Sequence, residues 1–169
     1  MCSTLVSSID SHPIEALMGS ISELPALPNK NLQAIIDRIK SYVAEHAEWA
    51  KEAAPYIQTL DNFIFFNQKA LKFKRENDPH FSAFKCVALD DLPGLKLLVL
   101  NGEDVNQQTL RSGKTALHLA ASLAKFKALE ILLTHPDIDL TVLTKDGKLA
   151  HELATHESIQ KLLAVTKMA

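Results

Sequence analysis

The chain has 169 residues, enough for one substantial core or two small modules. With 47% hydrophobic residues and only five glycines, its composition favours helices over a turn-rich sheet protein. The net charge of −2 provides no general attraction to nucleic acid or to an anionic membrane surface, so we expect neither as a partner.

The first residues and the cysteines bear on the compartment. The first twenty residues lack a basic start and a long apolar run, and no stretch of the sequence reaches membrane-spanning length. Cys2 and Cys86 are too few and too far apart for a zinc site or a disulfide framework. We therefore expect no secretory signal, no membrane span and a reducing, cytoplasmic location.

The first half of the chain predicts helices. Residues 13–22 form a short amphipathic segment. From Asn29 to Ala54 apolar residues recur at i, i+3, i+4 and i+7, which predicts a long helix with Asn29 as its N-cap. Pro55 either ends this helix or begins the next.

A further helix is predicted from about Tyr56 to Glu76. Its apolar residues spread over more than one face, so we expect it to be covered on two sides. Cations gather near its end, where they complement the helix dipole, and this interpretation is preferred to a nucleic-acid site: Lys69, Lys72, Lys74 and Arg75. Asn77-Asp-Pro79 marks a junction to the second half.

Apolar residues in the second half of the chain occur in paired groups, each at helical spacing. Two groups of apolar residues at helical spacing are separated by the polar residues Lys125 and Lys127. The first group is Leu117, Ala120 and Ala121, and the second is Ala128, Leu129, Ile131 and Leu132. This pattern predicts a helical hairpin. Its small alanines allow close approach of neighbouring helices, and its leucines fill the space between stacked units.

One motif makes this hairpin specific. Gly113-Lys-Thr-Ala-Leu-His-Leu-Ala-Ala121 resembles the start of an ankyrin repeat, and Gly102-Glu-Asp-Val-Asn106 resembles the end of one. Thr115 lies 34 residues after Phe81 and 34 residues before Leu149, close to the ankyrin period.

The resemblance implies an all-α fold with about three ankyrin units, the first degenerate and the last truncated with a shortened second helix. We assign residues 1–80 to a helical N-terminal cap or small bundle packed on the repeats, and residues 81–169 to the repeat solenoid.

The resemblance also implies local roles and departures. Thr115 and His118 would hydrogen-bond locally and brace the first helix of the second unit. Asp90 and Ala124 stand where the family turns between its helices with glycine, and alanine adopts a left-handed backbone poorly. In the second unit His135-Pro136-Asp137 replaces the usual glycine, and Pro136 should stop the helix.

The sequence offers little catalytic chemistry. His151, Glu152 and His156 have one residue too many between the histidines for the zinc-protease spacing, so we expect no metal site. Cys86 stands where the family has a buried alanine, which predicts an inert thiol. There is no glycine-rich phosphate loop and no serine elbow, so we expect no cofactor and no enzyme.

The favoured function is binding of another protein through the concave ankyrin face. The alternative is a small enzyme or enzyme regulator whose helical half acts while the repeats recruit the target. Both bacterial effectors that act in a host cytosol and eukaryotic adaptors resemble this arrangement; the partner and oligomeric state stay open. The family's variable positions imply these partner-binding residues: Arg111, Ser112, Lys114, Ser122, Leu123, Lys145, Asp146 and Lys148.

Overall fold

A computed structural model describes residues 28–166, and within that range it contains seven α-helices, two short 3₁₀ helices and no strand. The helical segment expected at residues 13–22 lies outside the described residues. The chain forms two compact units that meet within one helix, the first ending at Ala70 and the second beginning at Leu71. The all-helical prediction is confirmed for the described residues.

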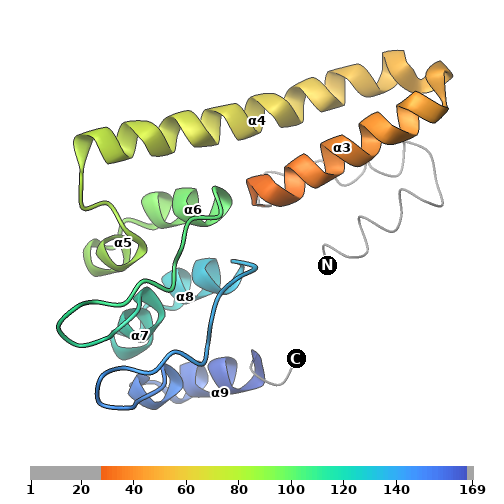
Figure 1. The fold of residues 1–169 in the computed structure, drawn as a ribbon. Coiled ribbons are helices and arrows are strands. Elements are labelled where there is room, and N and C mark those ends of the chain that lie inside the picture. The colour runs from red at the N-terminus through yellow and green to blue at the C-terminus, as the bar shows by residue number, and fades with distance from the viewer. Residues whose placement is uncertain (1–27, 167–169) are drawn as a thin grey trace. The chain divides into compact units, whose positions relative to one another are not determined.

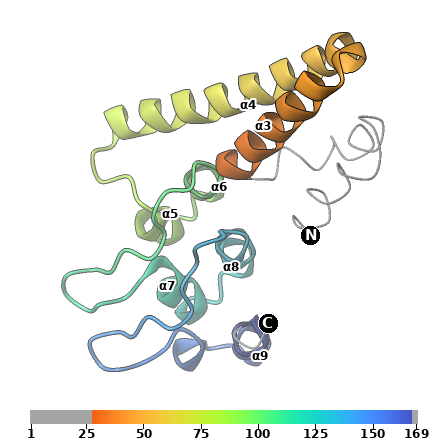
Figure 2. The ribbon, with the colours of Figure 1, turned by 45° about the vertical axis from the view of Figure 1, so that its right-hand side comes forward.

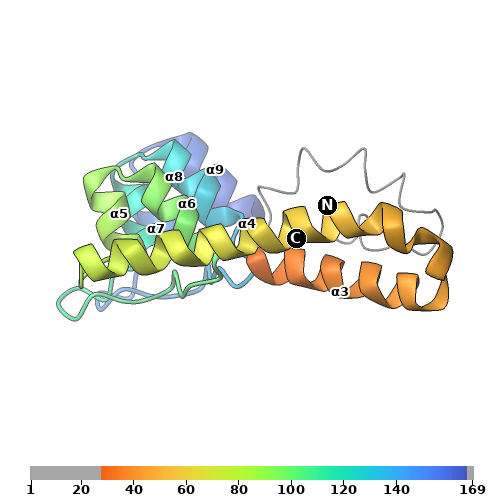
Figure 3. The same cartoon turned by 90° about the horizontal axis from the view of Figure 1, so that it is seen from above.

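The first unit contains a helical hairpin. Helix α3 (Asn29–Glu45) runs beside the first part of helix α4 (Ala50–Asn77), as Figure 3 shows. Apolar side chains at helical spacing on both helices form its core: Leu32, Ile35, Ile36, Ile39, Ala53, Leu60 and Ile64. The side-chain amide of Asn67 donates to the Asn29 side-chain oxygen at 3.0 Å and so joins the start of α3 to α4.

The position of the turn between these helices corrects our prediction. The first helix ends at Glu45, not at Ala54, because His46 has a non-helical backbone with φ −132° and ψ 74°. A 3₁₀ helix, η2 (Ala47–Trp49), completes the turn. The apolar spacing continues through it because both helices contribute to one core. Pro55 lies inside α4. Because proline has no backbone N–H, the carbonyl of Lys51, four residues earlier, loses its helical hydrogen bond. Lys51 is exposed, so this carbonyl can bond to water instead.

The outer face of α4 also differs from our expectation. Phe65, Phe66 and Phe73 are 56%, 64% and 66% exposed, so the prediction that this helix is covered on two sides was wrong for these residues. Lys69 lies over the ring of Phe65, 5.8 Å from its centroid. Lys74 and Arg75 stand in the last turn, as their interaction with the helix dipole requires.

The second unit stacks three helix pairs. The pairs are α5 (Ala83–Leu89) with α6 (Leu92–Leu100), α7 (Ala116–Ser122) with α8 (Phe126–Leu133), and η3 (His151–Leu153) with α9 (Glu157–Thr166). First helices contact first helices, α5 on α7 and α7 on η3, while α6 contacts α8 (Figure 1). A single core runs through all three pairs and includes Leu95, Leu117, Leu132 and Ile159.

The turns between paired helices have a left-handed residue where the sequence lacks glycine. Asp90 has φ 60° and Ala124 has φ 52°. In both turns the next amide reaches back into the first helix: Asp91 N–H donates to the Cys86 carbonyl, and Lys125 N–H donates to the Ala120 carbonyl, each at 2.9 Å. The two turns therefore have the same geometry at a spacing of 34 residues, as the proposed period requires.

The first helices begin differently in each unit. In α7, Thr115 Oγ1 accepts from the His118 amide, and His118 Nδ1 accepts from the Thr115 amide at 3.2 Å, a complete capping box. In the first unit Phe81 stands at the equivalent position and cannot cap, so Ser82, one residue later, accepts from the Lys85 amide.

The start of the third unit corrects our prediction of its shortened helix. Leu149 cannot accept a hydrogen bond through its side chain, although its amide donates to the Glu152 carboxylate at 2.7 Å. Only a single 3₁₀ turn follows, and Ala154 is already extended with ψ 124°. The second helix, α9, has ten residues against eight in α8. The shortened element is therefore the first helix, not the second.

Candidate protein-binding surface

Two loops project from the helix pairs on the same side (Figure 2). We call residues 107–114 the first loop and residues 141–148 the second loop. Each closes on itself through backbone hydrogen bonds, Thr109 N–H to the Lys114 carbonyl and Thr144 N–H to the Lys148 carbonyl, both at 2.9 Å. Gly113 and Gly147 supply the left-handed backbone at the turns, with φ 69° and 72°. Both loops therefore have defined shapes.

The two loops are bonded to each other. Lys145 N–H donates to the Ser112 carbonyl at 3.0 Å, and the Lys145 ammonium donates to the Leu110 carbonyl. The Gln108 side chain donates to the Leu143 carbonyl at 2.8 Å. A Cβ on Gly113 would lie 2.8 Å from the Lys145 nitrogen, so glycine is needed for this approach. The loops form one platform, which we call the loop platform.

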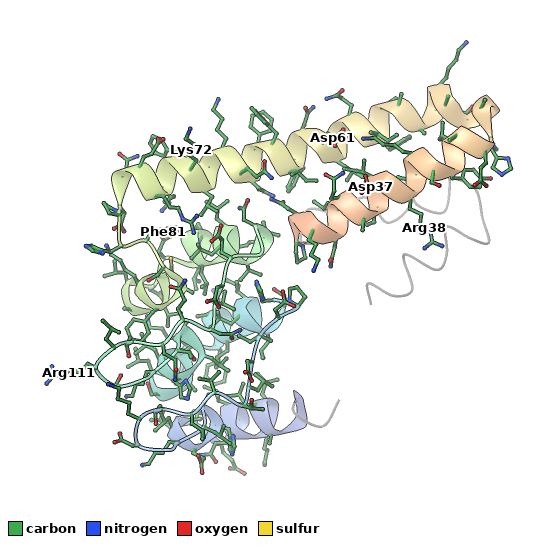
Figure 4. All side chains as sticks on the ribbon, in the orientation of Figure 1. Asp37, Arg38, Asp61, Lys72, Phe81 and Arg111 are labelled. Atoms are coloured by element: carbon green, nitrogen blue, oxygen red, sulfur yellow. The ribbon has the colours of Figure 1, made fainter. Side chains whose placement is uncertain are left out.

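The loop platform is basic with an apolar tip. Leu110 is 94% exposed, and Arg111 beside it is also exposed and points away from the chain in Figure 4. Three further cations and one acid belong to the platform: Lys114, Lys145, Lys148 and Asp146. Among the described residues, none of the four cations has a carboxylate partner, whereas Lys74, Arg75, Lys85 and Lys125 each do.

The structure brings together six of the eight sequence-predicted residues on the loop platform and leaves two apart from it. Ser122 is the last residue of α7, and Leu123 follows it, at the end of the helix away from the loops. The seven residues of α7 span about 10 Å at about 1.5 Å per residue. Leu123 is 52% exposed, and the Ser122 hydroxyl donates to the Leu119 carbonyl at 3.0 Å.

Sequence reasoning missed three residues of the platform. Leu110 and Leu143, which are 94% and 50% exposed, present apolar surface, and Gln108 joins the loops. We took candidates from the positions that vary in the family, and these three lie one to three residues away from the candidates in sequence. The detectable signal was a leucine within a run of polar loop residues, since such a leucine has no helix face on which to be buried.

Cys86 and His118, whose side chains can be catalytic in other proteins, are both buried in the second unit. Cys86 is 2% exposed, and burial raises the pKa of its thiol to about 11, so the thiolate is scarce at neutral pH. His118 is 1% exposed, and burial lowers its pKa. Because its Nδ1 accepts from the Thr115 amide, its Nε2 carries the proton and donates to the Lys148 carbonyl at 3.2 Å.

Two of the three residues considered for a metal site, Glu152 and His156, make structural contacts. Glu152 accepts from the Leu149 amide, and the ring of His156 lies edge-on to Phe126 with centroids 5.3 Å apart. Between residues 28 and 166, no group of three or more histidine, cysteine, aspartate or glutamate residues is arranged to hold a metal ion. None of the helices in that range combines the length and apolar character needed to cross a bilayer.

Comparison with known proteins identifies the repeats. The family model described as ankyrin repeats in three copies matches residues 83–167, half of the chain. The chain belongs to the ankyrin-repeat family. This confirms the resemblance and the three-unit interpretation, and residues before 83 lie outside the match.

Several relatives share the repeat region. The nuclear factor NF-kappa-B p105 subunit of Gallus gallus is 40% identical over 83 residues, which are 49% of this chain and 8% of that protein. The I-Kappa-B like proteins G2 and G1 of Microplitis demolitor bracovirus (isolate Webb) are 33% and 27% identical over 91 and 74 residues. These segments cover 50% and 44% of this chain, and 54% and 42% of the viral proteins. The chain thus spans about half or less of each relative. An ankyrin fold with such relatives supports a protein-protein interaction module.

Proposed function

We propose that the chain binds a partner protein through the concave ankyrin face, formed by the loop platform, the half-buried side of α7 and the exposed Leu123 that follows α7. The observation that carries this proposal is the exposed Leu110 and Arg111 on a loop fixed to its neighbour by hydrogen bonds. A rigid surface that presents an apolar residue and an arginine loses little conformational freedom on binding, and interface energy concentrates in such residues.

The proposed module is not an enzyme. Its partner-binding residues are the loop residues Arg111, Ser112, Lys114, Lys145, Asp146 and Lys148, with Ser122 and Leu123 extending the surface along α7. The relatives' names refer to NF-kappa-B and to I-Kappa-B like proteins, which supports a role in holding another protein. We propose that the chain acts in a cytoplasm, either as an adaptor or as an effector delivered to a host cytosol.

The test is affinity capture with the full chain from a eukaryotic lysate. The variant Arg111→Glu with Leu123→Ser changes one residue at each end of the proposed surface. Its control, Lys127→Glu with Phe126→Ser, makes the same types of change on α8. We expect the first variant to lose at least about tenfold of the captured partner and the control to retain it, since truncation of a central anchor typically costs about 2 kcal/mol or more. Full capture by a folded first variant would place the contact surface elsewhere.

A further inference from the structure

The loop platform carries a charge that the rest of the second unit does not share. Most of the described cations elsewhere in this unit lie beside carboxylates: Lys74 Nζ is 2.9 Å from Asp91, and Lys125 Nζ is 2.9 Å from Asp90. On the platform Arg111, Lys114, Lys145 and Lys148 face a single acid, Asp146. Since the chain as a whole has a net charge of −2, this positive charge is local. A local excess of unpaired cations attracts an anionic partner surface.

The apolar tip narrows the kind of partner. Leu110 lies among these cations and is 94% exposed, so a partner that only supplied charge would leave it in water. Burial of a leucine side chain stabilises a complex, which favours a partner that also presents apolar surface. Phosphate backbones lack such a side chain. The platform also lacks an aromatic residue on which a base could stack, because residues 107–114 and 141–148 contain no phenylalanine, tyrosine or tryptophan.

We propose that the loop platform binds an acidic protein segment in which aspartate or glutamate residues flank an apolar residue seated against Leu110. This inference rests on the proposed function and names the class of partner. Stacked helices lie about 8–10 Å apart, and an extended strand advances about 3.3 Å per residue. Two acidic residues about three positions apart therefore reach both loops.

Selection from a random library of 12-residue peptides displayed on phage tests this class directly. The full chain is used as bait beside Arg111→Glu with Lys148→Glu, which reverses two platform charges and leaves the Lys145 hydrogen bonds in place. The control bait, Lys96→Glu with Lys127→Glu, makes the same change in charge on α6 and α8. Circular dichroism and thermal unfolding establish that all three baits are folded.

We expect peptides selected by the wild-type chain and by the control to be at least about threefold richer in acidic residues than the starting library, with an apolar residue between them. The charge-reversed bait should select no such peptides. The selected peptide should bind the wild-type chain at least about tenfold more weakly in 500 mM than in 50 mM salt, because exposed charges are screened.

Three outcomes would overturn the inference: no acidic enrichment, the same peptides from the charge-reversed bait, or a 12-nucleotide single strand that binds as tightly as the best peptide. Lysate capture separates this failure from failure of the proposed function. If the Arg111 and Leu123 variant loses its partner while the charge-reversed chain retains it, the surface is right and the acidic class is wrong. If both variants retain the partner, the proposed function itself fails.

Discussion

The left-handed alanine between α7 and α8 leads to a quantitative prediction. Ala124 has φ 52°, a conformation that costs an L-residue roughly 1–2 kcal/mol and that glycine adopts freely. Glycine loses about 0.4–1 kcal/mol more backbone entropy on folding. The Ala124 methyl group is half-buried and packs against the core. Removing it therefore costs only part of the roughly 0.8 kcal/mol that a fully buried methylene group contributes. We therefore expect Ala124→Gly to stabilise the second unit by about 0.5 kcal/mol.

Urea unfolding followed by circular dichroism measures this change. With a slope of about 2 kcal/mol/M, the midpoint should rise by about 0.25 M. Ala88→Gly is the control, because Ala88 is an exposed residue inside α5, where glycine should destabilise by about 0.5–1 kcal/mol. Asp90→Gly should give no gain, since aspartate tolerates the left-handed region better and Asp90 also pairs with Lys125 at 2.9 Å. If Ala124→Gly lowers the midpoint as Ala88→Gly does, the strain argument is refuted.

Three further predictions concern stability. Leu132 is fully buried, so Leu132→Ala should lower the free energy of unfolding by about 2–5 kcal/mol. An unchanged urea midpoint would contradict its place in the core. Burial lowers the pKa of His118 below its unfolded value of about 6.5, so the unfolded state binds more protons as the pH falls. The glutamine in His118→Gln can still complete the capping box but has no titrating group. The free energy of unfolding of the wild-type chain should therefore fall relative to that of the variant as the pH drops from 7.5 to 5. Residues 80–169 alone should melt at a lower temperature and less sharply than the full chain or residues 71–169. The shorter fragment lacks Leu71, which belongs to the core of the second unit, and the ion pair between Lys74 and Asp91. A sharp transition at the same temperature as that of the full chain would contradict this prediction.

The sequence predicted those parts of the fold that depend on local spacing. The 34-residue period placed Asp90 and Ala124 in equivalent turns, and both residues have a left-handed backbone. The missing glycine therefore did not distort the turn at Ala124, contrary to what the poor left-handed preference of alanine suggested. The turn between α3 and α4 was missed because both helices bury residues in one core, so apolar spacing continues across the turn at His46. Pro55 was misleading because a proline near the start of a helix is tolerated where the unpaired carbonyl faces water.

The candidate surface was only partly predictable, for a physical reason. The spacing of the repeats fixes where the loops leave the helices, so positions such as Arg111 and Lys145 could be chosen from the family resemblance. Some contacts between the loops join two backbone groups, such as the Ser112 carbonyl that accepts from the Lys145 amide, and side-chain identity does not specify these. Others use a side chain that donates to a backbone carbonyl whose position depends on the folded loop, as Gln108 does to Leu143.

The exposed Leu110 follows from the same contacts. The Lys145 side chain holds the Leu110 carbonyl, which fixes the loop that carries the leucine at its tip, away from the helices where it could be buried. A flexible loop could instead turn an isolated leucine toward the core and so remove it from water. Because the second loop holds the first in place, this leucine stays exposed beside Arg111, and its cost in water is recovered only when a partner covers it.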